Sequence, residues 1–211
     1  MERLRICNTE GAGGMIKIYF VRHAQPVSPW PDDRTKPLTE QGLADRQVVM
    51  DVMGDIPVDA VYCSTYRRSI ETIEAFAASR GLEIVTEERL RERKAGPDSW
   101  SHLVRRWADF SHSEDYGECL RSVQNRNIEV IHKLLDKHAG QTLLIGTHGT
   151  ALSTILHYFD ATFGEKDSWR FLNSLPYIIR LDFEGRQCVG KEELHWNERG
   201  YTAHSNVPRN V

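Results

Sequence analysis

The chain has 211 residues, and its 27 lysines and arginines stand against 30 aspartates and glutamates, which gives a formal net charge of −3. Hydrophobic residues make up 40% of the sequence, enough for a sizeable core, and this charge balance argues against a bulk binder of nucleic acid or membrane surfaces. No apolar run approaches the roughly 18 residues of a membrane-spanning helix.

The start of the chain predicts a flexible extension over residues 1–14, because it ends in a glycine cluster and lacks the apolar centre of a secretory signal. A start codon at Met15 is the alternative interpretation. Residues 15–211 are expected to form a single domain, since no linker-like stretch divides them. The four cysteines are widely spaced without a Cys-x-x-Cys pair, so we expect neither a disulfide framework nor a zinc site. The compartment that we expect is the reducing cytoplasm.

The run Ile16–Val21 is apolar and β-branched, which predicts a short buried strand. Arg22 and His23 follow it directly. Open α/β sheets bind ligands in the crevice at the carboxyl ends of their strands, so these two side chains lie where a site is expected. Arginine offers a permanent charge with forked donors that match phosphate, and histidine offers a nucleophile or proton carrier near neutral pH.

The segment Pro26–Pro37 carries four prolines and predicts an irregular loop that overhangs this strand exit as a wall of the site. Thr39 then predicts the start of a helix that runs to about Met53.

A second strand, Ala60–Cys63, leads through Ser64-Thr65 into a helix over Arg67–Ala78 with apolar residues at helical spacing. Arg68 lies in the first turn of that helix. A short strand at Glu83–Val85 precedes the segment Leu90–Gly96, in which Glu92 is the single acid among cations.

The second half continues the alternation of helices and strands. A strand over Gln141–Thr147 runs into His148, so two histidines leave two strands at what we expect to be one edge of one sheet. Arg105 and Arg106 predict an exposed helix face, with cations for an acidic substrate as the alternative. The other predicted elements are helices at Trp100–Phe110, Cys119–Lys137 and Gly149–Phe159 and a closing hairpin of Ile178–Phe183 with Gln187–Lys191.

This alternation predicts an α/β fold: a three-layer sandwich with a mostly parallel central sheet, an antiparallel edge and helices on both faces.

Four segments, taken in order, resemble the histidine phosphatase superfamily, also called the phosphoglycerate mutase-like family. The resemblance extends from about Met15 to Leu181 and rests on the order of the motifs as well as on their residues. The matching segments are Arg22-His23-Ala24, Cys63-Ser64 through Arg68 to Thr72, Leu90-Arg91-Glu92 with Gly96, and Thr147-His148-Gly149.

The resemblance implies a role for each of these residues. His23 would be the nucleophile that forms a phosphohistidine, with its second ring nitrogen fixed by a hydrogen bond. Arg22, Arg68 and His148 would hold the phosphoryl oxygens, and Glu92 would be the general acid. The further residues that we expect to contact the substrate are Gln25 and Gly149.

Alternatives remain at two of these positions. Arg67 is adjacent to Arg68, and the spacing to Thr72 selects Arg68 as the active residue and leaves Arg67 in solvent. Glu92 could be an ordinary surface acid, in which case Glu118 is the next candidate for the acid. We expect no cofactor and no metal, because the other histidines form no ligand pattern with a nearby acid.

The resemblance therefore implies a metal-independent phosphomonoester hydrolase whose partner is a small phosphorylated substrate, with no nucleic acid and no membrane. A phosphoglycerate mutase is the alternative, disfavoured by the short stretch between Glu92 and His148 and by the proline-rich first loop. A phospho-ligand binding domain without catalysis is the third interpretation. The sequence carries no signal for the oligomeric state.

Overall fold

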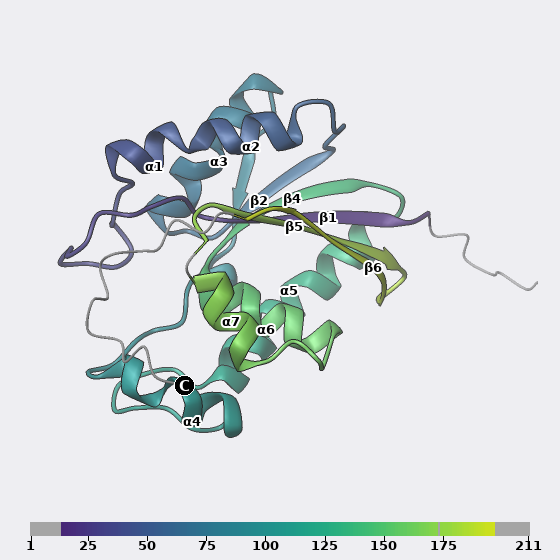
Figure 1. Ribbon diagram of the computed structural model, residues 1–211. Helices are drawn as coiled ribbons and strands as arrows, with labels where there is room; N and C mark the ends of the chain where they lie inside the picture. Colours follow the sequence, from purple (N-terminus) through teal and green to yellow (C-terminus); the bar gives the residue numbers. More distant parts are fainter. Residues whose placement is uncertain (1–13, 173, 197–211) are drawn as a thin grey trace, which may run out of the picture.

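The structure, a computed structural model, describes residues 14–172 and 174–196. Within these ranges one sheet has the strand order β3-β2-β4-β1-β5-β6 (Figure 1). The strands are β1 (Ile16–Arg22), β2 (Ala60–Cys63), β3 (Ile84–Thr86), β4 (Thr142–Thr147), β5 (Tyr177–Glu184) and β6 (Gln187–His195). β1 to β4 pair in parallel, whereas β5 and β6 are antiparallel.

Helices cover both faces of this sheet. Figure 1 shows α1, α2 and α3 over one face and α5, α6 and α7 over the other, with α4 farther out. The helices are α1 (Glu40–Ala44), α2 (Arg46–Met53), α3 (Arg67–Ser79), α4 (Leu103–Ala108), α5 (Leu120–Lys137), α6 (Gly149–Phe159) and α7 (Glu165–Leu172), with 3-10 turns η1 (Glu88–Leu90) and η2 (Ser99–His102). The predicted fold class is confirmed.

The position of β1 between two helix layers explains why its sequence is apolar almost throughout. Ile16, Ile18 and Phe20 belong to the core under α5 and α6, whereas Tyr19 and Val21 belong to the core under α2 and α3. A strand with a helix layer on each face must bury both of its sides, so it loses the alternation of a half-exposed strand.

Several predicted boundaries differ from the structure. The helix expected from Thr39 to Met53 is two helices, because the backbone at Asp45 turns to φ −67° and ψ −9° between them. The helix expected at Trp100–Phe110 is the turn η2 followed by α4, and α7 was not predicted. None of the helices in the described ranges is long and apolar enough to cross a membrane. The extension over residues 1–14 lies, except for Gly14, outside the described residues.

The strand register brings the two predicted histidines to one edge of the sheet. Arg22 at the end of β1 lies opposite Thr147 at the end of β4, and the backbone N–H of His23 donates to the Thr147 carbonyl at 3.1 Å. Because β1 and β4 are parallel neighbours, their next residues, His23 and His148, leave the sheet side by side.

Candidate active site

His23 is buried at the exit of β1 and both of its ring nitrogens have partners. Nδ1 lies 2.8 Å from the carbonyl oxygen of Ala24, and Nε2 lies 3.1 Å from Nε of Arg68. A guanidinium can only donate, so Nε2 accepts and Nδ1 carries the proton that it donates to Ala24. The prediction that a hydrogen bond fixes one ring nitrogen is confirmed, with the Ala24 carbonyl as the acceptor, and the lone pair of the other nitrogen faces Arg68.

The electrostatics of the site keep this ring neutral. Burial is the main cause that lowers the pKa of His23 well below its usual 6.5, and the charges of Arg68 and Arg22 lower it further. A neutral imidazole at pH 7 has the lone pair that a nucleophile needs.

Arg68 and Arg67 separate as the sequence predicts. The Arg68 side chain is 4% exposed, whereas that of Arg67 is 56% exposed and pairs with Glu71 at 2.6 Å. One turn after Arg68, the Thr72 hydroxyl donates to the Arg68 carbonyl at 2.7 Å and accepts from the N–H of Ala24 at 2.9 Å. The spacing of arginine and threonine therefore joins α3 to the loop that carries His23.

His148 is the fully buried N-cap of α6 and faces His23, with 5.2 Å between the ring centroids. Its Nε2 lies 2.7 Å from the Ser64 hydroxyl, and its buried Nδ1 has no hydrogen-bond partner in the described part of the chain. Burial, then the charges of Arg68 and His23, lower its pKa well below 6.5. The strand exits after β1, β2 and β4 thus each supply a polar side chain to one place.

Tyr66 is a site residue that sequence reasoning missed. It is the N-cap of α3, and its ring lies 5.1 Å from the Arg68 guanidinium and 5.2 Å from the His148 ring centroid. The aromatic face of Tyr66 lies against the Arg68 cation, and the ring also contacts the buried His148. Tyr66 therefore forms a wall of the site beside these two residues. Its position right after the strand exit Ser64-Thr65 was the available signal.

The three other predicted ligands differ in their placement. Arg22 is buried, and its Nη1 donates to the carbonyl of Ser174, just beyond α7, at 3.0 Å. Gly149 opens α6 directly after His148. Gln25, by contrast, accepts from the Thr39 hydroxyl at 3.2 Å through its amide oxygen, so in this structure it braces the start of α1. Its role as a substrate ligand stays a prediction.

Glu92 lies against the first turn of α6, next to His148. Its Oε1 accepts from the N–H groups of Arg93 at 2.7 Å and Ala151 at 3.1 Å, and its Oε2 accepts from Thr150 at 3.0 Å. The carboxylate thus supplies the cap that the helix N-terminus lacks from its own N-cap residue. Oε2 thus has one backbone donor, whereas Oε1 has two.

Glu118, the alternative acid, forms ion pairs with two arginines. It accepts from Arg91 at 2.8 Å and from Nε of Arg126 at 2.9 Å. Burial would raise the pKa of Glu118, but the hydrogen bonds from Arg126 and Arg91 outweigh it and lower the pKa to about 2. A carboxyl with so low a pKa holds no proton to donate at neutral pH, which leaves Glu92 as the candidate acid.

The prediction that Arg106 lies on an exposed face is wrong. Its side chain is buried and donates to Glu114 at 2.7 Å, and Arg93 donates to the same carboxylate at 2.7 Å. Gly117 packs against that carboxylate so closely that a Cβ there would lie 2.6 Å from Oε1. The buried group holds the segment after Glu92 in place, and only Arg105 of the pair is exposed.

The loop Pro26–Pro37 reaches the site as expected. The carbonyl of Asp33 accepts from Nη1 of Arg68 at 2.6 Å, and its carboxylate lies 3.2 Å from Nη2. Lys36 pairs with the other carboxylate oxygen at 2.8 Å. Partial burial opposes it, but the charge of Arg68 and the hydrogen bond from Lys36 lower the pKa of Asp33. An anion of the chain itself therefore lies on the predicted phosphate ligand.

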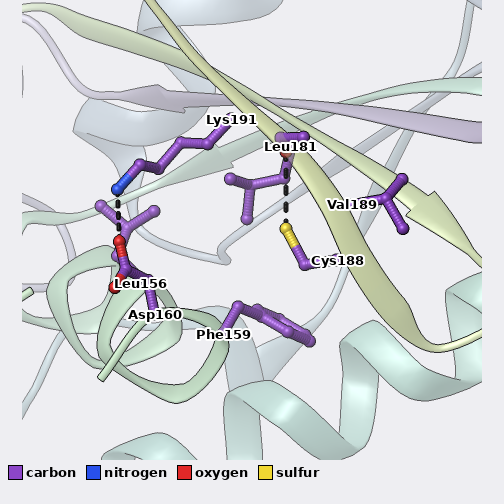
Figure 2. Close-up of a pocket in the computed structure, with 8 residues that line it drawn as sticks. Leu156, Phe159, Asp160, Leu181, Cys188, Val189 and Lys191 are labelled. Atoms are coloured by element: carbon purple, nitrogen blue, oxygen red, sulfur yellow. Dashed lines mark hydrogen bonds and ion pairs between the residues drawn. The ribbon is translucent and has the colours of Figure 1, made fainter. Parts of the chain in front are cut away.

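A separate pocket of about 220 Å³ lies at the other end of α6, against β5 and β6 (Figure 2). Its walls are mostly apolar, apart from an ion pair of Lys191 with Asp160 at 2.5 Å and the thiol of Cys188, which donates to Gly190. It contains none of the predicted site residues. Among the described residues no group of three or more His, Cys, Asp or Glu is arranged to hold a metal ion.

Comparisons with known protein sequences point to one superfamily. The sequence model of the histidine phosphatase superfamily, branch 1, matches residues 18–197. Phosphoserine phosphatase 1 of Hydrogenobacter thermophilus is 26% identical over 152 residues, 64% of this chain and 71% of that protein. Phosphoglycerate mutase-like protein 4 of Arabidopsis thaliana is 27% identical over 211 residues, 88% of this chain and 89% of that protein.

Solved structures give the same result for the fold. YhfR of Bacillus stearothermophilus superposes with a TM-score of 0.69 at 25% identity, over 82% of this chain and 94% of that chain. A mycobacterial glucosyl-3-phosphoglycerate phosphatase superposes with a TM-score of 0.68 at 16% identity, over 87% and 99%. At that identity the second likeness concerns the fold alone.

Proposed function

The chain belongs to the histidine phosphatase superfamily, and on that premise we propose that it is a metal-independent phosphomonoester hydrolase that works through a phosphohistidine. One observation carries the proposal: the Nε2 lone pair of a neutral, buried His23 faces the predicted phosphate ligand Arg68 at 3.1 Å. A ring held in this tautomer by the Ala24 carbonyl is ready for attack through a defined atom.

In the first step, Nε2 of His23 attacks phosphorus and the bond from phosphorus to the leaving oxygen breaks. Arg68, which in the free site donates to Nε2, donates to phosphoryl oxygens instead, Arg22 neutralises further charge, and the neutral His148 ring donates a hydrogen bond. Glu92 gives its proton to the leaving alkoxide, which departs as an alcohol. The second step reverses these roles, since the Glu92 carboxylate takes a proton from water as water breaks the bond between nitrogen and phosphorus.

A substrate of small size fits the site, because the attacking nitrogen is buried and Tyr66 and the loop Pro26–Pro37 stand over it. A phosphomonoester such as phosphoserine is a reasonable first substrate to test, since a relative named phosphoserine phosphatase is 26% identical. We place the enzyme in the cytoplasm, which is supported by the free thiols of the three described cysteines.

Mutase activity is the second candidate. It is favoured by the relative named phosphoglycerate mutase-like, which matches along 88% of this chain. The two activities share every step up to the phosphohistidine and differ in the acceptor, which is water in a hydrolase and a hydroxyl of a phosphorylated sugar acid in a mutase.

The test is turnover of an aryl phosphate and a panel of phosphomonoesters, with chelator present, in wild type and His23→Ala. We expect hydrolysis that survives the chelator, an acid-labile phosphoenzyme in wild type, and neither in a folded His23→Ala variant. Activity that requires added metal, or an acid-stable phosphoenzyme, contradicts the mechanism. Faster transfer to a phosphoglycerate than to water identifies a mutase, and phosphate binding without turnover identifies a binding domain.

A further inference from the structure

Arg126 on α5 holds the segment that carries Glu92, although it lies far from that segment in the sequence. Its Nη1 donates to the carbonyls of Arg89 at 2.5 Å and Arg91 at 2.7 Å, and its Nη2 donates to the carbonyl of Glu92 at 3.2 Å. One carbonyl in η1 and two in the irregular segment after it thus converge on one guanidinium. In a strand or helix these three carbonyls would accept from backbone N–H groups, whereas here they accept from the Arg126 side chain.

The guanidinium is itself fixed in place. Its side chain is 12% exposed, and Glu118 accepts from its Nε at 2.9 Å and its Nη2 at 3.1 Å. The same Glu118 accepts from Arg91, whose Nη1 donates to the Glu92 carbonyl at 2.9 Å. Two arginines bridged by one carboxylate therefore clamp the backbone on both sides of Glu92.

The clamp contacts the backbone of a segment that has no regular structure of its own. Residues 91–96 have no regular secondary structure, so no ladder of backbone hydrogen bonds places them. The Glu92 carboxylate nevertheless meets the N–H groups of Thr150 and Ala151, in the turn that follows His148. Catalytic groups that act on a bound substrate lose about 10²-fold in rate when they are misplaced by about 1 Å, so this placement matters.

We propose that Arg126 is a positioning residue for the general acid: it fixes the backbone of Glu92 so that the carboxyl stays at the start of α6, beside His148. This inference rests on the proposed function for the catalytic role of Glu92, whereas the placement itself is a property of the structure. A merely structural Arg126 would stabilise the fold without any particular effect on proton donation.

The experiment uses Arg126→Met, which keeps the aliphatic stem, and Arg121→Met as the matched control. Arg121 lies on the same helix and carries the same charge, but it is exposed and stacks on Phe110. One measurement is the rate on an alkyl phosphate, β-glycerophosphate, relative to that on an aryl phosphate, p-nitrophenyl phosphate. The other is amide hydrogen exchange at Thr150 and Ala151, which reports the position of the Glu92 carboxylate without any turnover.

We expect Arg126→Met to slow alkyl phosphate hydrolysis about 10-fold to 10²-fold, aryl phosphate hydrolysis much less, and to speed exchange at both amides. Because Arg126 acts through Glu92, adding Arg126→Met to Glu92→Gln should not change the ratio of the two rates further. Arg121→Met should leave ratio and exchange unchanged. Arg126→Lys keeps the charge and the stem but loses the forked donors, so it should shift the rate ratio and the amide exchange in the same direction. It replaces the methionine variant if that variant fails to fold.

Equal losses on both substrates, or unchanged exchange at Thr150 and Ala151, overturn the inference. The failure of the proposed function has a different signature. If wild type hydrolyses neither phosphate, or if Glu92→Gln slows both equally, the hydrolase or the acid role fails, and exchange in Arg126→Met still decides whether Arg126 positions the carboxylate.

Discussion

Thr72 joins the two halves of the site through one hydroxyl group. It accepts from the N–H of Ala24 and donates to the carbonyl of Arg68, so the loop after His23 and the helix that carries Arg68 keep a fixed separation. A buried N–H without an acceptor is costly, which makes this threonine a sensitive position.

Thr72→Val should lower the free energy of unfolding by about 1 to 3 kcal/mol, because valine has the same shape but leaves the buried Ala24 N–H unpaired. Thr72→Ser keeps the hydroxyl and should lose clearly less. Urea unfolding of the three proteins measures the difference. A serine variant as unstable as the valine variant would mean that the methyl group, and not the hydroxyl, supplies the stability.

Glu92 is the residue on which the leaving group depends. Glu92→Gln should slow hydrolysis of alkyl phosphates by about 10² to 10⁴, because their leaving oxygen must be protonated. An aryl phosphate leaves as a stabilised anion and should lose much less. Steady-state rates on both substrates check this. No loss on either substrate would remove Glu92 from the mechanism. Glu118 would not be the replacement, because its hydrogen bonds from Arg126 and Arg91 lower its pKa to about 2.

At the scale of elements, the loop Pro26–Pro37 competes with the substrate for the Arg68 guanidinium that helix α3 supplies. Asp33 lies on Nη2 of Arg68, and phosphate must displace that carboxylate in order to bind there. The Asp33 side chain is 49% exposed, so the contact is a weak one.

Asp33→Asn should therefore tighten the binding of inorganic phosphate about twofold to fivefold at fixed ionic strength, as titration calorimetry can measure. Asp32→Asn is the matched control, because it removes the same charge from the same loop while Asp32 contacts the backbone of Arg34 instead. An equal gain in both variants would attribute the effect to net charge. Weaker binding in Asp33→Asn would show that Asp33 orients Arg68 for the phosphate.

At the scale of the whole molecule, the burial of two histidines couples the fold to pH. His23 and His148 both have a pKa well below 6.5 in the folded protein, chiefly because of burial and the nearby arginines. In the unfolded chain each ring takes up a proton near pH 6.5. Below that pH the unfolded state binds more protons than the folded state, so acid favours unfolding.

The free energy of unfolding should accordingly fall between pH 7 and pH 5, with a limiting slope of about 1.4 kcal/mol per pH unit for each ring. The carboxylates of Glu114 and Glu118, whose pKa values are lowered to about 2, affect stability below about pH 5 and leave the range from pH 7 to pH 5 to the histidines. Denaturant unfolding at several pH values measures the slope. His148→Gln should flatten it, and a wild-type protein equally stable at pH 7 and pH 5 would contradict the prediction.

Much of this architecture follows from local sequence. Apolar segments that lack alternation, such as Ile16–Val21, indicate strands buried on both faces, as in a parallel sheet. The residues that follow such strands lie at one edge of the sheet, regardless of the conformation of the loops. For this reason Arg22, His23 and His148 could be placed together from the sequence alone. The bounds of α6 follow as well, since its apolar pattern is strong and Asp160 ends it.

The tertiary structure alone decided the partners that come from loops. Asp33 comes to Arg68 from an irregular loop, and the irregular segment that carries Glu92 lies against Arg126 of α5. No periodic pattern records where such a segment lies. The adjacent charges of Arg105 and Arg106 predict a solvent-exposed helix face, whereas the buried partner of Arg106, Glu114, comes from the loop after α4. Local patterns reflect burial on a regular element, whereas ion pairs between loops depend on distances that only the folded chain defines.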